Sequence, residues 1–286
     1  MKKIYVEHAN IGNLMFRLMF AEHLRRHIPD SVVTGPSIPE WGILLANDRP
    51  KNPVVLKPKY EKVEVADVVD AVSQPDCDGV IVSYYGLRLE YFSAQRDMFM
   101  ALFQTSSGGQ FTEPDELVIH VRAAETLGGI HPDYNPVPIS HYRALLERTG
   151  LRPVFTGQTR PSFYSDALRQ SFPNARFLSG NHWLDDFQTT RNAQNIALSV
   201  SSFVWLAAWL SQTAKRIYMP QLGLFNPLQR PDIDLSPVDD PRYVFEPFPV
   251  EKYEATPEQL LRTIVDPMRQ ANSWAGGMSA SAKWTP

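Results

Sequence analysis

Residues 3–24 read KIYVEHANIGNLMFRLMFAEHL, and this stretch decides the fold class. Its first four residues, Lys3–Val6, form a mainly apolar run that is typical of a buried strand. A turn at residues 9–13 contains glycine and asparagine, and from Leu14 to Leu24 apolar side chains recur at the spacing of a helix. A strand, a glycine-containing turn and a helix in this order open a doubly wound α/β domain. Open α/β sheets bind their ligands at turns of this kind.

The second half of the chain repeats this alternation. A strand is predicted at residues 117–121, and short apolar runs then alternate with helical patterns as far as a strand at 216–219. Such alternation favours a parallel sheet. We therefore expect an α/β protein with two Rossmann-like domains that face each other across a cleft. The expected units are an N-terminal domain at 1–112, a C-terminal domain at 113–250, a helix at 251–272 and a loose tail at 273–286.

Further segments carry their own expectations. Residues 88–103 and 185–194 are predicted to be helices, and the segment 222–249, rich in proline and aspartate, is predicted to be irregular. Another helix should begin at 256–258, where threonine is placed to cap the helix and proline occupies its first turn. The polar, glycine-containing segment 104–110 marks the expected domain boundary.

The composition limits the function classes. The chain has 286 residues, of which 43% are hydrophobic and 21% charged, so it is globular rather than disordered. Its formal net charge is −3, without the basic field of a nucleic-acid-binding protein, and we expect no nucleic-acid partner. The sequence contains no apolar run of membrane-spanning length and no signal-peptide pattern at its N-terminus, which predicts a cytoplasmic protein.

Neither thiol chemistry nor metal binding is predicted. Cys77 is the only cysteine, and the acidic residues Asp76 and Asp78 beside it oppose thiolate formation. The segment 232–234 reads Asp-Ile-Asp, a short pattern that also occurs by chance, and no clear strand precedes it. Two histidines lie four residues apart at 23 and 27, but the glutamate of the His-Glu-x-x-His motif is absent.

The first candidate site is His120-Val121-Arg122, at the end of a predicted strand. Alternation along a strand puts His120 and Arg122 on the same side, and the carboxyl end of a parallel strand opens toward the ligand. The planar guanidinium of Arg122 suits a diphosphate. The alternative is a buried histidine beside a surface arginine.

Two helix starts provide further candidates. Ser201 and Ser202 lie in a strand-to-helix turn, where unpaired backbone N–H groups bind phosphate readily; alternatively, one serine simply caps the helix. Asp185 and Asp186 begin the next candidate helix. One of them should be its N-cap, and the other could accept hydrogen bonds from a base or a ribose.

Several segments, in order along the chain, resemble a known family. Residues 12–16 read GNLMF, 120–125 read HVRAAE, and 138–142 read PISHY. Residues 185–187 read DDF, and 195–210 read NIALSVSSFVWLAAWL, which is the most specific match. With these segments the chain resembles the bacterial α-1,2-fucosyltransferases, family 11 of the glycosyltransferases, and more distantly the α-1,6-fucosyltransferases.

The resemblance implies a GT-B fold and an inverting, metal-independent transfer of fucose from GDP-fucose to a glycan acceptor. The N-terminal domain would then shape the acceptor site, and the C-terminal domain would bind the nucleotide sugar. No cofactor or metal beyond this donor substrate is implied. The acceptor would be an oligosaccharide or a lipid-linked glycan, and the latter would bring the protein to the inner membrane surface. The implied donor-site residues are Gly12, Asn13, His120, Arg122, Asp186, Ser201, Ser202 and Phe203.

Within that set the resemblance implies separate roles. Arg122 would hold the β-phosphate and stabilise the leaving GDP, and His120 and Asp186 would face the guanine. Ser201, Ser202 and Phe203 would form the phosphate turn. Without a metal, the charge developing on the diphosphate must be met by arginine and by helix-terminal N–H groups.

The chain departs from the family pattern at several positions. Ala123 replaces a second arginine and Glu125 an aspartate, and residues 155–159 lack the acidic pair that follows the corresponding strand in the family. We take Glu125 as the candidate general base, with His131 and Asp133 on the same loop as alternatives. The departures also leave two other readings open: a related transferase with another nucleotide-sugar donor, and a non-catalytic nucleotide- or glycan-binding homologue.

Overall fold

The computed structural model describes residues 1–57, 62–105, 108–178 and 182–265. The N-terminal half contains a parallel sheet with the strand order β2-β1-β4-β3. Its elements are β1 (Lys2–Val6), α1 (Ile11–Arg25), β2 (Ser31–Thr34), β3 (Pro53–Leu56), α2 (Val65–Val72), β4 (Gly79–Val82) and α3 (Arg96–Leu102). Helix α1 buries ten of its 15 residues because its apolar positions extend around most of its surface.

The C-terminal half contains a second parallel sheet with the order β10-β9-β8-β5-β6-β7. Its strands are β5 (Glu116–Val121), β6 (Arg152–Gly157), β7 (Arg176–Phe177), β8 (Asn195–Ala197), β9 (Arg216–Gln221) and β10 (Tyr243–Pro247). Its helices are α4 (Ile139–Thr149), α5 (Phe163–Ser171), α6 (Trp183–Asn192), α7 (Ser202–Trp209) and α8 (Pro257–Ile264). Single 3-10 turns occur at Pro39–Trp41, Leu89–Tyr91, Ser93–Gln95, Thr126–Gly128 and Gly223–Phe225.

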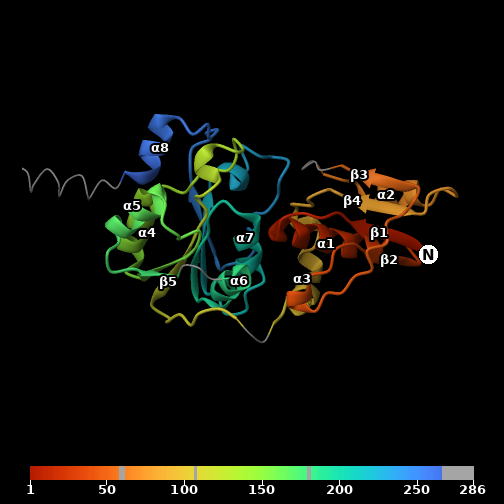
Figure 1. Ribbon diagram of the computed structural model, residues 1–286, viewed down its shortest axis with the longest axis horizontal. Coiled ribbons are helices and arrows are strands. Elements are labelled where there is room, and N and C mark those ends of the chain that lie inside the picture. The colour runs from red at the N-terminus through yellow and green to blue at the C-terminus, as the bar shows by residue number, and fades with distance from the viewer. Residues whose placement is uncertain (58–61, 106–107, 179–181, 266–286) are drawn as a thin grey trace, which may run out of the picture.

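Figure 1 shows how the two halves are arranged. Helices α4, α5 and α8 cover the outer face of the second sheet, while α6 and α7 lie between that sheet and α1 and α3 of the N-terminal half. Strand order reverses between β1 and β4 in the first sheet and between β5 and β8 in the second. The carboxyl ends of strands at such reversals are where open α/β sheets bind ligands. The predicted α/β fold with two Rossmann-like domains is confirmed.

A continuous apolar core joins the two domains. The ring of Phe16 on α1 lies 5.7 Å from that of Trp205 on α7, and Phe92 lies 5.4 Å from Trp209. Trp41 packs edge-on against Phe187 of α6 at 5.3 Å. Aromatic pairs of this kind add to the energy of simple area burial, so the domains are held together by a substantial hydrophobic interface.

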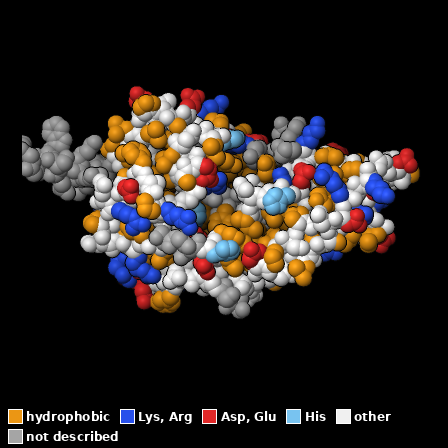
Figure 2. Space-filling view, in the orientation of Figure 1, with side chains coloured by type: hydrophobic (Ala, Val, Ile, Leu, Met, Phe, Trp, Pro, Cys, Tyr) orange, Lys and Arg blue, Asp and Glu red, His pale blue; other side chains and the backbone are white. Residues whose placement is uncertain are grey.

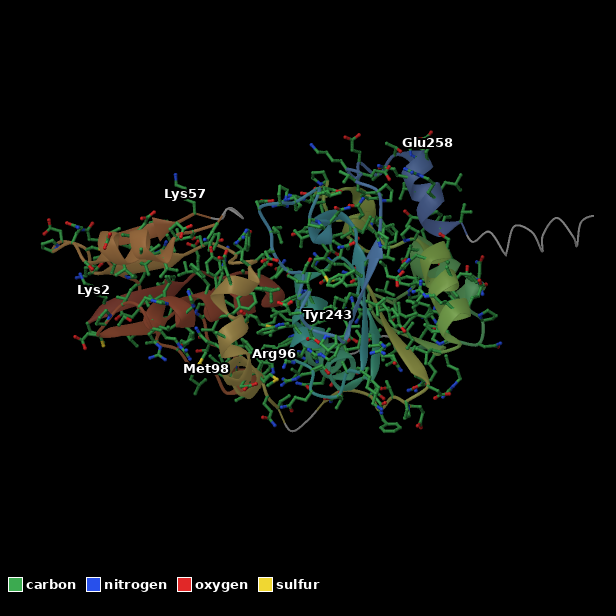
Figure 3. The ribbon with its side chains drawn as sticks, turned by 180° about the vertical axis from the view of Figure 1, so that it is seen from behind. Lys2, Lys57, Arg96, Met98, Tyr243 and Glu258 are labelled. Atoms are coloured by element: carbon green, nitrogen blue, oxygen red, sulfur yellow. The ribbon has the colours of Figure 1, made fainter. Side chains whose placement is uncertain are left out.

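Two arginines add polar contacts across the same interface. Arg96 at the start of α3 donates from Nε to the Trp209 carbonyl at 2.8 Å and from Nη2 to the Ser211 carbonyl at 2.9 Å. In Figure 3 Arg96 lies where the two domains meet. In the reverse direction, Arg191 on α6 donates to the carbonyls of Phe103 and Met100, at 2.6 and 3.0 Å. Both arginines satisfy carbonyl groups at the ends of helices in the other domain.

Some local predictions are wrong. The segment 88–103 is not one helix, because two 3-10 turns precede α3. The segment predicted to be irregular contains β10, which pairs with β9 at the edge of the sheet, where flanking prolines are tolerated. Helix α8 begins after Thr256, the expected N-cap, which also forms a capping box with Gln259 that was not predicted, and the helix ends at Ile264. Residues 266–286, with the rest of the predicted helix and the tail, lie outside the described residues, and the domain boundaries stay predictions.

Candidate functional site

The candidate site lies at the strand reversal of the second sheet. Arg122 directly follows β5, and the turn after β8 leads through Ser201 into α7. Nη1 of Arg122 donates to Oγ of Ser201 at 3.4 Å. The structure therefore brings together two motifs that are 79 residues apart in the sequence.

Two helix N-termini meet at this point. The N-cap of α7 is Ser201 and that of α1 is Asn10; in the described structure neither side chain makes a capping hydrogen bond, and neither helix has an acidic residue in its first turn. Oγ of Ser202 donates to Oδ1 of Asn13 at 3.2 Å. The positive ends of two helix dipoles and their unpaired N–H groups are thus close together, an arrangement that favours an anion.

The side chain of Arg122 is held on several sides. Its Nε and Nη2 atoms lie 3.1 and 2.9 Å from Oε1 of Glu125. Its guanidinium also lies 5.2 Å from the ring centroid of Tyr134, within the range of a cation–π interaction. About a fifth of the side chain (22%) remains exposed. The cation is therefore positioned in advance and still accessible to a ligand.

Glu125 has a second partner, because Nε2 of Gln158 donates to its Oε2 atom at 2.7 Å. Partial burial raises the pKa of Glu125, but the hydrogen bond from Gln158 and the positive charge of Arg122 outweigh this effect and lower it below its ordinary value. The carboxylate is therefore ionised at neutral pH and bonded to two side chains.

His120 lies beneath the surface of the site. It is 6% exposed, and its Nδ1 atom is 2.8 Å from Oγ of Ser199. Gly157 of the neighbouring strand leaves room for the ring, since a Cβ on that residue would lie 2.9 Å from Nε2 of His120. Desolvation and the nearby charge of Arg122 lower the pKa of His120 to about 3, so the imidazole is neutral at physiological pH. The structure thus contains the buried histidine that the sequence left open as an alternative.

The two acidic residues of α6 lie in its first turn, and neither is its N-cap. That position belongs to His182, whose ring accepts a hydrogen bond from the backbone of Leu184, so this part of the prediction is wrong. Asp186 accepts a hydrogen bond from Thr156 Oγ1 at 2.6 Å, which places it beside the end of β6. Asp185 accepts one from the backbone N–H of Gly109 at 3.4 Å.

The alternative base candidates are held differently. Asp133 is buried and accepts hydrogen bonds from Arg230 at 2.9 Å and from Gln229 at 2.8 Å, so it fixes the loop that carries it. Nδ1 of His131 lies 3.7 Å from Oδ2 of Asp133.

Sequence reasoning missed Tyr134 and Gln158. Gln158 lies within the segment that departs from the family pattern, and that departure was the signal available.

The other candidates for special chemistry are engaged in structural contacts. Both carboxylate oxygens of Asp232 accept hydrogen bonds from Arg230, at 2.9 and 2.7 Å. In the described ranges, no group of three or more His, Cys, Asp or Glu side chains is placed to hold a metal ion. Cys77 precedes β4 and so lies at the amino edge of the first sheet, opposite the carboxyl edge where the β1–α1 turn begins.

Figure 2 shows a hollow between the two lobes, with histidine side chains on both lobes beside it. Two cavities lie elsewhere. One of about 750 Å³ is formed by residues 89–96, Trp209 and residues 234–241, and one of about 310 Å³ lies between the start of α4 and α8. None of the site residues predicted from the sequence lines either cavity.

No protein-family model and no curated protein sequence matches the chain. Among solved structures, it is similar to E. coli heptosyltransferase WaaC with ADP, at 14% identity and a TM-score of 0.44, over 96% of this chain and 98% of that one. It is also similar to E. coli ADP-heptose LPS heptosyltransferase II, at 12% identity and a TM-score of 0.42, over the same shares. The two parallel sheets, each with its own helices, agree with the two Rossmann-like domains expected from the sequence. Among the residues that the structure describes, no helix is both long and apolar enough to cross a membrane.

Proposed function

We propose that the chain is a GT-B glycosyltransferase that binds a nucleotide-diphosphate sugar between its two domains, with GDP-fucose as the first candidate donor. The observation that carries this proposal is the meeting of Arg122 with the N-termini of α1 and α7. A diphosphate at that point would be met by one guanidinium and two sets of backbone N–H groups.

The proposed reaction needs such a site. An acceptor hydroxyl oxygen forms a bond to the anomeric carbon while the bond from that carbon to the β-phosphate oxygen breaks. The electron pair leaves with the nucleoside diphosphate, and the hydroxyl proton passes to a base. Arg122 would meet the negative charge that grows on the leaving diphosphate, because donors positioned in advance stabilise charge without reorganising.

Glu125 suits the positioning of Arg122 better than the role of base. An effective base has a pKa near the working pH, whereas the pKa of Glu125 is lowered by its partners. The opposite wall of the site offers other candidates, since the turn from β1 to α1 carries the half-buried Glu7 and the exposed His8. Glu7 is anchored there by Ser83 and by Arg49, the latter at 3.2 Å. We propose that the acceptor lies against this turn.

A ligand panel tests the donor. Thermal unfolding would be measured with GDP, GDP-fucose, UDP, dTDP and ADP, each in the presence of excess chelator. Stabilisation by GDP and GDP-fucose alone is the expected result, and a ligand at a hundred times its Kd stabilises by about 2.7 kcal/mol. Stabilisation by UDP, dTDP or ADP instead would overturn the donor while keeping the transferase. No stabilisation by any of them would contradict a nucleotide-binding function.

Turnover tests the role of Arg122. In Arg122→Ala, kcat should fall by about 10²- to 10³-fold, the effect of removing one donor to a developing oxyanion. Arg216→Ala is the matched control, because Arg216 is exposed at the amino end of β9, on the opposite edge of the sheet. Full activity in Arg122→Ala would exclude the proposed role. Nucleotide binding without turnover toward any glycan would favour the non-catalytic homologue.

A further inference from the structure

Gln158 makes three hydrogen bonds to the four residues that follow β5. Its Oε1 atom accepts from the backbone N–H groups of Ala123 and Ala124, at 2.7 and 2.8 Å. Its Nε2 atom donates to Oε2 of Glu125 at 2.7 Å. A single amide side chain therefore fixes both the backbone and the carboxylate of the segment that starts at Arg122.

The backbone of Gln158 is itself fixed to the end of β5. Its N–H group donates to the carbonyl of Val121 at 2.9 Å, and the residue before it, Gly157, pairs with Val121 in the register of β5 and β6. The amide thus starts from a rigid sheet edge. Side chains that act from such an edge hold their partners more precisely than side chains on loops.

The contacts continue from Glu125 to the phosphate turn. Oε1 of Glu125 accepts from Nε of Arg122 at 3.1 Å, and Nη1 of Arg122 donates to Ser201 at 3.4 Å. Gln158 touches neither Ser201 nor α7 in these contacts, so it acts on the anion site only through its neighbours.

The chemistry of this position favours an amide. The Oε1 atom must accept from two backbone N–H groups while Nε2 donates to an ionised carboxylate. Only the side-chain amides of Asn and Gln combine a carbonyl acceptor and an NH₂ donor in one group. A carboxylate at residue 158 would accept the two N–H groups equally well but would repel Glu125.

We propose that Gln158 is a positioning residue that sets the orientation of Arg122 through Glu125. The proposal deepens the proposed function and rests on it for the catalytic consequence, while its geometric part concerns Arg122 alone. Gln158 keeps Glu125 ionised and directed at the guanidinium, and it holds the 123–124 backbone in the turn that brings both side chains together.

The first test compares Gln158→Glu with Gln158→Ala in the full-length protein. Gln158→Glu keeps the size of the side chain and its two backbone contacts but places a second carboxylate beside Glu125. We expect kcat to fall by about tenfold to a hundredfold, as misplacement of a catalytic group does, with little change in KM for the donor or in Tm. Gln74→Glu, at an exposed position of the N-terminal domain, is the control and should leave kcat unchanged.

The pH profile separates positioning from a purely structural role. In Gln158→Glu, protonation of one of the two neighbouring carboxyl groups supplies an O–H donor in place of the lost N–H donor of Gln158. Activity relative to the original protein should therefore recover as the pH falls from about 7 to about 5. Gln158→Ala has no group to protonate and should show no recovery. Equal profiles for the two variants would overturn the proposal.

A measurement without turnover separates this proposal from the proposed function. The Nε–H signal of Arg122 in ¹⁵N NMR spectra reports its bond to Glu125, and it should shift or broaden in Gln158→Glu and in Glu125→Ala but not in Gln74→Glu. An unchanged signal in Gln158→Glu would refute positioning even if the enzyme is a transferase. A changed signal in a protein that transfers no sugar would keep the positioning and reject the reaction.

Discussion

Gly12 and Phe203 belong to helices in different domains, and their backbones are in direct contact. A Cβ atom added to Gly12 would lie 2.9 Å from the backbone nitrogen of Phe203 and 3.0 Å from its Cα. Only glycine allows this approach without displacement of a backbone. The contact sets how closely the N-termini of α1 and α7 approach, and the proposed anion site depends on that closeness.

Gly12→Ala should therefore weaken both the domain interface and the anion site. Overpacking of this kind costs about 1–3 kcal/mol, and we expect a lower Tm together with weaker binding of the nucleotide that stabilises the original protein. Thermal unfolding with and without that nucleotide measures both effects. Gly128→Ala is the matched control, because a Cβ there meets nothing within 4 Å. Equal losses of Tm in the two variants would show that the contact with Phe203 is unimportant.

Arg191→Ala should destabilise the whole molecule. It removes the donors to the carbonyls of Met100 and Phe103, and each buried group left without a partner costs about 1–3 kcal/mol. Because the apolar core is continuous across the domains, unfolding in denaturant should remain a single transition with a lower midpoint. Arg216→Ala is again the control. A separate early transition in Arg191→Ala would mean that the domains unfold independently.

Much of the fold was predictable because local patterns determine it. The strand–turn–helix at residues 3–24 and the helix start at Thr256 are specified by residues that are close in sequence. Strand β10 was missed although Tyr243, Val244 and Phe245 are hydrophobic, because prolines surround this short run and its pairing with the edge of β9 is not a local pattern. The broken helix at 88–103 has a similar cause: Arg88 and Leu89 are drawn into contact with Asp234, on a distant segment.

The site was predictable in part for a different reason. Arg122 and the Ser201–Phe203 turn follow strands, and the ends of neighbouring parallel strands meet at one edge of a sheet. The residues that hold Arg122 in place were not predictable. Gln158 and Tyr134 belong to no recognised motif, and only the folded chain brings them close to Glu125 and Arg122. The sequence also did not show that His182, and not an aspartate, is the N-cap of α6, since histidine is not a preferred N-cap residue.

Tyr134→Ala should impair donor use by loosening Arg122. The ring lies 5.2 Å from the guanidinium, and a cation–π interaction at a partly exposed site contributes about 0.5–2 kcal/mol. This corresponds to a loss of roughly two- to thirtyfold in kcat/KM. Tyr134→Phe keeps the ring face and should retain most of the activity. Steady-state kinetics of the two variants decides the point, because an equal loss in both would assign the effect to the hydroxyl group instead.

The buried His120 should make the protein sensitive to acid. Its pKa is lowered to about 3 in the folded state, against about 6.5 in an unfolded chain. Between these two values the unfolded state binds more protons, so the free energy of unfolding should fall as the pH is lowered from about 6.5 toward 3. One group contributes at most about 1.4 kcal/mol per pH unit to this slope.

His120→Gln removes the proton-binding site and should reduce the slope, whereas His8→Gln, at an exposed position, should not. His23, whose pKa is lowered to about 4 mainly by desolvation, keeps part of the slope in every variant. Urea unfolding at pH 7.5 and pH 5 measures the effect, and an unchanged difference between the two pH values in His120→Gln would show that the imidazole is protonated in the folded protein.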